Sequence, residues 1–224
     1  MWDDHEVDDD FISTHHLMPI GRRAFFDYWP IRLYVQDPAR LFRAFRWGKE
    51  VELFLLDTRQ YRNPATKTML GKAQKEWLLD QLAASSARFK FIFSSVPYSD
   101  PRLDKWGEYP EERNEILEFI TRRNIMGVVF LAGDVHHAAV SRIPDFPERK
   151  EFIFGPLAAQ MNYKISRREP RFDFFYENSP NYGKITVRPH ELKPSVHIEW
   201  FDEHNILLNR VTLEDDGNYA SISR

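Results

Sequence analysis

The order of apolar runs and amphipathic segments predicts alternating strands and helices in the first part of the chain. Residues 51–56 form a short apolar run that ends in polar residues, which is typical of a buried strand. Two more strands are expected at 89–93 and 126–132, and the latter is the most apolar of the three. Helices are predicted over 72–84 and 111–123, where apolar residues recur along one stripe. This order favours parallel strands with right-handed crossovers in a sheet that is covered on both faces.

After residue 138 the pattern predicts strands without helices between them, and therefore antiparallel pairing. The expected strands lie near residues 139–143, 151–154, 184–187, 195–200 and 206–213. A short helix is expected near 21–28. Residues 162–182 are rich in charge and aromatic rings, and they are expected to form a long loop that acts as a lid or a surface wrap. The chain shows no repeat or linker, so residues 1–224 are predicted to be a single domain.

Composition and charge exclude several classes of protein. Hydrophobic residues make up 42% of the 224 residues and charged residues 29%, which excludes a disordered chain. The net charge of -3 argues against a dedicated nucleic-acid-binding domain, and no apolar run is long enough to span a membrane. The absence of cysteine excludes disulfides and thiolate chemistry. No basic segment followed by an apolar one occurs in the first thirty residues, so no signal peptide is expected in this chain.

Polar residues at the ends of the predicted strands are candidates for binding chemistry, because ligands bind beyond the carboxyl ends of parallel strands. These strand ends carry residues 57–59, 94–95 and 133–137. If the last segment is extended, Asp134 and His136 project to the same side and form half of a metal site. The alternative is that Asp134 caps a turn and that His136 is a partly buried histidine with a satisfied hydrogen bond.

A second candidate segment lies at the start of the chain. Residues 3–10 contain six acidic residues and a histidine. An acidic run of this kind is usually a solvated surface segment. Asp4, His5 and Glu6 would nevertheless supply another ligand and a neighbouring histidine if this segment reached the end of the predicted sheet.

Taken together and in order, these pieces resemble the PhoD-like (alkaline phosphatase D) branch of the calcineurin-like metallophosphoesterases. The matching segments cover residues 2–6, 22–32, 56–62, 69–71, 94–97, 106, 109–113, 133–136 and 154–157. The resemblance implies an α/β fold, specifically a four-layer αββα sandwich. It also implies hydrolysis of small phosphate monoesters or diesters by a hydroxide that two metal ions activate. The branch is associated with iron and calcium together, and manganese or zinc are alternatives.

The resemblance also implies roles for individual residues. Asp4 would bind metal, and His5 would act near the phosphate as an acid or an electrostatic helper. Asp134 would bind one metal ion and His136 the other. Arg59 is a candidate phosphate ligand because a guanidinium matches the geometry of phosphate, although an ion pair with Asp57 or with another acid is an equally good interpretation.

Two smaller expectations concern neighbouring residues. Asp57 is expected to be structural. His137 is expected to lie outside the direct metal ligands or on the surface.

In the family, the first metal ligands precede the Asp-Asp-His-Glu motif at which this chain begins. We therefore expect the C-terminal portion of the catalytic domain, lacking its N-terminal strand or strands. The exposed sheet edge should make it less stable than a longer domain. An inactive remnant that serves as a binding or interaction domain is the alternative function, and a metal-binding domain unrelated to phosphatases is a third. PhoD-like proteins are often exported, but the sequence leaves localisation and oligomeric state undetermined.

Overall fold

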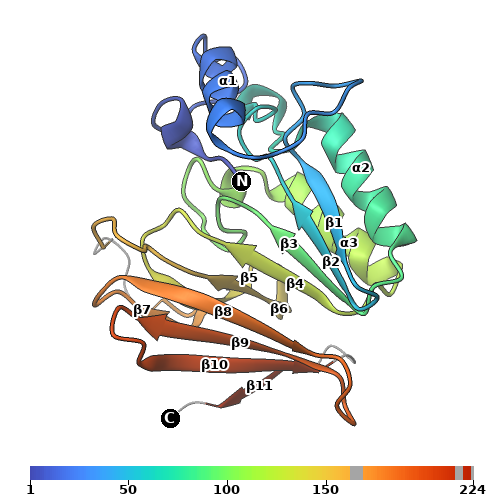
Figure 1. Cartoon of the computed structure of the whole chain (residues 1–224), viewed down its shortest axis with the longest axis vertical. Helices are drawn as coiled ribbons and strands as arrows, with labels where there is room; N and C mark the ends of the chain where they lie inside the picture. The colour runs from blue at the N-terminus through green and yellow to red at the C-terminus, as the bar shows by residue number, and fades with distance from the viewer. Residues whose placement is uncertain (162–168, 215–218, 223–224) are drawn as a thin grey trace.

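The strands form two sheets that pack face to face in the computed structural model, which describes residues 1–161, 169–214 and 219–222 (Figure 1). The larger sheet has the strand order β1-β2-β3-β4-β6-β5-β7, and the smaller one the order β11-β10-β9-β8. The larger sheet consists of β1 (Arg43–Trp47), β2 (Val51–Leu55), β3 (Phe89–Phe93), β4 (Val128–Ala132), β5 (Ala138–Ile143), β6 (Phe146–Ile153) and β7 (Phe172–Tyr176). The smaller sheet consists of β8 (Asn181–Arg188), β9 (Ser195–Asp202), β10 (Leu207–Glu214) and β11 (Tyr219–Ile222).

Parallel strands occupy the centre of the larger sheet. β2 pairs with β3 and β3 with β4 in parallel, as the sequence predicts. β4 also runs parallel to β6, whereas the other described pairs in both sheets are antiparallel. The carboxyl ends of β2, β3 and β4 therefore meet at one edge of the sheet, where the candidate residues were expected.

Helices α2 (Gly71–Ala84) and α3 (Pro110–Arg122) cover one face of the larger sheet (Figure 1). Their apolar stripes face the sheet, with Leu78 and Leu82 on α2 and Ile116 and Ile120 on α3 fully buried against residues such as Ile92. The predicted helices at 72–84 and 111–123 are thus confirmed to within one residue at each end.

The second face of the larger sheet packs against the smaller sheet. Phe91, Val129 and Phe152 of the larger sheet meet Ile198 and Trp200 of β9 in one buried cluster. Val196, Ile198 and Trp200 alternate with other residues along β9, and all three side chains are buried between the sheets. The parallel sheet is covered on both faces, by helices on one and by a second sheet on the other.

Helix α1 (Met18–Tyr28) lies beside the start of the chain, next to the 3-10 turn η1 (Asp4–Glu6) (Figure 1). Trp2, Phe11, Phe25 and Leu41 form a small separate core there. Two further 3-10 turns, η2 (Pro64–Thr66) and η3 (Trp106–Glu108), lie in loops. None of the helices in the described ranges combines the length and the apolarity needed to cross a membrane.

Three strands depart from the sequence-based expectation. β7 occupies 172–176, so the loop predicted for 162–182 is wrong for this part, while residues 162–168 lie outside the described residues. β1 and β11 were not expected as strands. β1 is an edge strand whose last three residues are exposed, which explains why no apolar run marks it.

The mixed α/β architecture with two packed sheets is that of the predicted class. Of the four layers of an αββα sandwich, the described residues supply one helical layer and both sheets. No described helix lies on the outer face of the smaller sheet. Among the described strands, β8 has one neighbour, β9, and its other edge is unpaired.

Candidate metal centre

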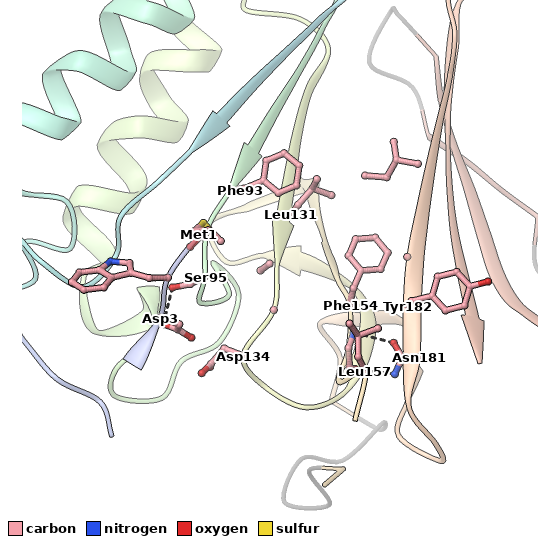
Figure 2. A pocket seen from close by; sticks show the side chains of 17 residues that line it. Met1, Asp3, Phe93, Ser95, Leu131, Asp134, Phe154, Leu157, Asn181 and Tyr182 are labelled. Carbon is pink, nitrogen blue, oxygen red and sulfur yellow. Dashed lines mark hydrogen bonds between the residues drawn. The ribbon is translucent and has the colours of Figure 1, made fainter. Parts of the chain in front are cut away.

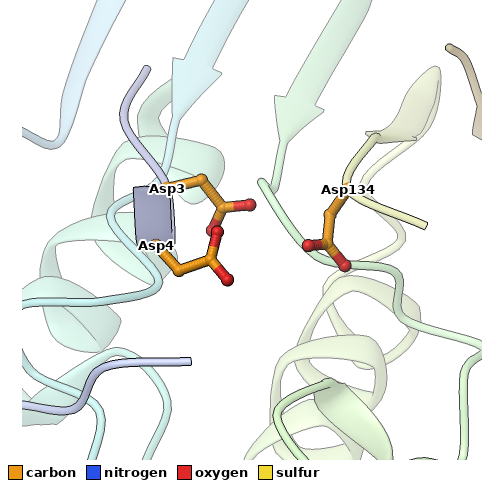
Figure 3. Close-up of side chains that lie close together, drawn as sticks. All are labelled: Asp3, Asp4 and Asp134. Atoms are coloured by element: carbon orange, nitrogen blue, oxygen red, sulfur yellow. The ribbon is translucent and has the colours of Figure 1, made fainter. Parts of the chain in front are cut away.

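Three carboxylates from the two predicted segments face one another at the carboxyl edge of the larger sheet (Figure 3). Asp3 and Asp4 come from the start of the chain, and Asp134 follows β4. Each offers one oxygen, and these oxygens all lie within 4.8 Å of one another. The chain start and the segment after β4 thus meet, which is the spatial arrangement that the metal-site interpretation required.

An aromatic anchor fixes the segment that carries Asp3 and Asp4. Trp2 is buried against Phe11 and Phe25, and its indole Nε1 donates a hydrogen bond to Asp57 Oδ1 at 2.9 Å. The chain then makes one 3-10 turn, in which the Glu6 carboxylate accepts the Asp3 backbone N–H at 2.8 Å. Asp57 is itself fully buried and bonded within the protein, consistent with its predicted structural role.

The Asp4 carboxylate is largely stabilised in its charged form. Its Oδ1 accepts the His5 N–H at 2.9 Å and its Oδ2 accepts the Asp10 N–H at 3.2 Å. Burial alone would raise the pKa of Asp4, but the Arg59 guanidinium and these two backbone hydrogen bonds together hold it below the usual value. Asp4 is therefore an anion that can serve as a ligand at neutral pH.

Asp3 is oriented by two side chains. Its Oδ1 accepts hydrogen bonds from Arg59 Nε at 2.5 Å and from Ser95 Oγ at 2.8 Å. Ser95 in turn contacts the hydroxyl of Thr58, so the ends of β2 and β3 both contribute to this support. Asp3 belongs to the acidic segment noted in the sequence, but it was not among the predicted metal ligands.

Asp134 is held in a turn rather than in an extended segment. Asp134 has φ 69° and His136 has φ 56°, both in the left-handed region. The expectation that the two side chains project together from an extended backbone is therefore wrong. Asp134 Oδ2 forms an ion pair with Lys105 Nζ at 2.5 Å. Burial raises the pKa of Asp134, and Lys105 opposes that effect.

The structure does not bring His136 into the cluster of three carboxylates. His136 Nδ1 lies 2.7 Å from the carbonyl oxygen of Gln160. Because a carbonyl only accepts, Nδ1 is the donor, and in the neutral ring Nε2 carries the lone pair. This is the hydrogen-bonding pattern that metal-binding histidines usually show.

His5 lies on the solvent side of Asp4. Its side chain is 81% exposed, with Nε2 4.0 Å from Asp4 Oδ1 and Nδ1 3.4 Å from Asp9 Oδ1. The ring is thus next to the carboxylate cluster and free to meet a ligand that arrives from solvent.

Arg59 is fully buried, and carboxylates already occupy most of its guanidinium. Nε binds Asp3, and Nη1 lies 2.7 Å from Asp104 Oδ1. Its Nη2 makes no hydrogen bond within the described residues and lies 3.8 Å from Asp4 Oδ2. The ion-pair interpretation describes these contacts, with Asp3 and Asp104 rather than Asp57 as partners. A two-pronged contact with phosphate is not available in this arrangement.

His137 is buried against the rings of Phe172 and Phe175. The part of its prediction that allowed a surface position is therefore wrong. β7, which was not predicted, supplies both rings and so explains the burial.

A pocket of about 560 Å³ begins at the acidic cluster and runs between the two sheets (Figure 2). Asp3, Ser95 and Asp134 line one end, and the rest is lined mainly by apolar side chains, including Phe93 and Phe154, together with the polar Asn181. On the far wall Gly183 of β8 is required, because a Cβ there would lie 2.2 Å from the Phe154 ring. The site is therefore a polar cluster at the mouth of an apolar cleft, an arrangement common in ligand-binding sites.

The donor set fits a hard cation. Three carboxylate oxygens at mutual ligand distance suit calcium, magnesium, manganese or iron better than a soft ion. The buried, unsatisfied Nη2 of Arg59 lies beside this cluster as a further donor for an anion. The sequence pointed to Ser95 only as one of the polar strand ends, and it did not point to Lys105, because the contacts of both with the cluster join residues that are distant in the chain.

The chain is similar to known proteins in both sequence and structure. The sequence profile of the PhoD-like phosphatase family matches residues 1–193. Alkaline phosphatase D of Bacillus subtilis (strain 168) is 25% identical over 253 residues, covering 88% of this chain and 43% of the relative. A solved structure described as "Structure of PhoD" superposes with a TM-score of 0.76 at 21% identity, covering 100% of this chain and 54% of the other. The chain thus spans about half the length of these relatives.

Proposed function

The chain belongs to the PhoD-like phosphatase family. We propose that it forms a large part of a metal-dependent phosphoesterase domain that hydrolyses small phosphate esters. The observation that carries the proposal is the convergence of Asp3, Asp4 and Asp134, two segments far apart in the sequence, at the carboxyl edge of the sheet. A merely solvated acidic tail would not place two of its carboxylates against the buried guanidinium of Arg59.

The three carboxylates would hold the cation, and neighbouring residues would orient them. Ser95 and Arg59 fix Asp3, and backbone N–H groups fix Asp4. Metal ions bound here would neutralise phosphate oxygens and lower the pKa of the attacking water. The three described carboxylates converge on one position, so a second metal ion would need another ligand. We further propose that the site holds two metal ions and that His136 Nε2 binds the second.

His5 and Arg59 would act on the substrate. His5 is the exposed group beside Asp4, so its Nε2 would deliver a proton to the leaving alkoxide oxygen. Arg59 would reach a phosphate oxygen through Nη2 alone, because Nε and Nη1 are held by Asp3 and Asp104. Iron together with calcium is the metal pair we propose, with manganese and zinc as the alternatives to be compared.

Hydrolysis of chromogenic phosphate esters tests the proposal. The purified chain, stripped of metals, is assayed on a monoester and on a diester with iron, calcium, manganese or zinc added singly and with iron and calcium together. We expect activity with added metal and none with chelator. Asp134→Asn and Asp4→Asn should each lower kcat/KM by at least about a hundredfold, a loss of roughly 2.7 kcal/mol in transition-state stabilisation.

Asp80→Asn is the matched control, because Asp80 is an exposed residue of α2 far from the cluster in sequence. It should leave both activity and metal content unchanged. A folded chain that binds no metal and hydrolyses neither ester would contradict the proposal and favour a role as a binding domain.

A further inference from the structure

A lysine that the sequence motifs do not include lies against the carboxylate cluster. Lys105 is 8% exposed, and its Nζ lies 2.5 Å from Asp134 Oδ2. Its backbone position is fixed by the next residue, Trp106, which is fully buried, stacks on Tyr98 at 4.8 Å and donates to Ser94 Oγ at 3.0 Å. The backbone that carries the ammonium is therefore anchored in the core, and the ion pair with Asp134 places the ammonium at the cluster.

Lys105 has a second anionic partner outside the cluster. Its Nζ lies 2.8 Å from Asp104 Oδ2, and Asp104 also binds the guanidinium groups of Arg59 and Arg62. If Lys105 released Asp134, its buried charge would still be paired with Asp104. This matters because a buried ammonium with no partner would be strongly unfavourable.

We propose that Lys105 is a resident counter-ion of the metal centre, which holds Asp134 while no metal is bound and competes with the incoming metal ion for that carboxylate. This inference rests on the proposed function, since it concerns the cation that the site would bind. The ammonium and the metal ion are both attracted by Asp134, so each weakens the binding of the other. Lys105 thus weakens the metal affinity of the site. In the metal-free protein, its positive charge offsets the repulsion among the carboxylates and so stabilises the fold.

Calorimetric titration tests the inference. The metal-free chain is titrated with Mn²⁺ alone and with Ca²⁺ alone. Lys105→Gln keeps a hydrogen-bond donor for Asp134 and removes the charge. Because one positive charge next to the site is lost, we expect the Kd to fall by at least about tenfold. Lys105→Arg keeps the charge and should stay within about threefold of the wild type. Lys72→Gln, an exposed change on α2, is the matched control and should have no effect.

Unfolding temperature gives a second measurement. Without metal, Lys105→Gln should unfold at a lower temperature than the wild type, because Asp134 loses its counter-ion. Added Mn²⁺ or Ca²⁺ should raise its unfolding temperature by more than that of the wild type. A variant that folds only with the metal ion present supports the inference, whereas one that folds under neither condition contradicts it, because the ion should replace Lys105 at Asp134.

The outcomes separate this inference from the proposed function. If the wild type binds metal and Lys105→Gln binds it equally or more weakly, Lys105 is not a competitor and only this inference fails. If neither protein binds Mn²⁺ or Ca²⁺, the metal centre itself fails and the inference with it. Tighter binding by Lys105→Gln alone supports both.

Discussion

At the scale of single residues, His137 is a buried imidazole in which a second proton, on Nε2, would have no hydrogen-bond acceptor among the described residues. Its Nδ1 donates to the Val135 carbonyl at 3.0 Å, and its Nε2 has no hydrogen-bond partner in the described residues. Burial lowers the pKa of His137 to about 4. The neutral imidazole is thus the form that the fold accepts.

We predict that this histidine makes the fold acid-sensitive. Its pKa is about 6.5 in an unfolded chain and about 4 in the fold, so the unfolded state binds more protons between these values. Stability is therefore lost as the pH falls from 6.5 to 4, by up to about 3 kcal/mol. Urea midpoints at pH 7 and pH 4.5 measure the loss.

His137→Phe removes the titrating group while keeping a ring against Phe172 and Phe175. Its midpoint should change less between pH 7 and pH 4.5 than that of the wild type. An equal change in both proteins would place the acid sensitivity in other groups.

Residues inside contiguous motifs were the ones that the sequence could identify. Asp4 and Asp134 stand in short motifs, and the structure brings them together. Ser95 and Lys105 could not be assigned, because their contacts with Asp3 and Asp134 exist only once the chain is folded. The left-handed backbone at Asp134 was likewise invisible, since non-glycine residues rarely adopt it.

At the scale of elements, Glu112 ties the start of α3 to the start of α2. Its carboxylate accepts the backbone N–H groups of Met69 at 2.5 Å and Leu70 at 3.2 Å, and also the Thr68 hydroxyl. Glu112 is buried, so these two N–H groups have no water to replace it.

We predict that Glu112→Ala lowers the free energy of unfolding by about 3 kcal/mol, because it leaves buried donors unsatisfied. Glu111→Ala is the matched control: Glu111 is exposed in the same helical turn, and its loss should cost about 0.5 kcal/mol or less. Urea unfolding of both variants measures the difference. Equal losses would mean that the helix dipole, and not the link to α2, is what Glu112 serves.

Elements with a strong apolar pattern were predictable, and edge elements were not. The central strands and both covering helices follow from runs and stripes of apolar residues that the core buries on each side. β7 lies at an edge of the larger sheet, within a segment whose charges and rings indicated a loop. Its strand conformation depends on pairing with β5, a long-range contact that a local pattern does not contain.

At the scale of the whole molecule, Trp200 joins the two sheets. It is fully buried, donates from Nε1 to the Ile153 carbonyl at 2.8 Å, and packs on Phe152, Phe154 and Phe174. One side chain of the smaller sheet thus makes both a hydrogen bond and ring contacts with the larger one.

We predict that Trp200→Ala lowers the free energy of unfolding by about 3–5 kcal/mol, the usual cost of deleting a buried large ring. Trp47→Ala is the control, since Trp47 is 76% exposed on β1 and should change stability by about 0.5 kcal/mol or less. Thermal and urea unfolding measure both. A small effect at Trp200 would mean that the sheets are held together mainly elsewhere.

The packing of two sheets was predicted from the family resemblance and not from the local pattern of residues. Local patterns predicted strands in the second half of the chain, but they did not show that these strands would divide between two sheets. That division depends on long-range pairing. β6 pairs with β4 and so joins the larger sheet, whereas β8 pairs with β9 and so joins the smaller one.

Because of how the chain start is anchored, the candidate site can be lost under milder conditions than those that unfold the two sheets. Asp3 and Asp4 lie in one 3-10 turn next to the small aromatic core around Trp2, outside the strands of both sheets. A sub-global opening confined to the first eleven residues would scatter two of the three carboxylates and leave both sheets intact. The proposed activity should consequently be lost at a lower denaturant concentration than the one at which the two sheets unfold cooperatively.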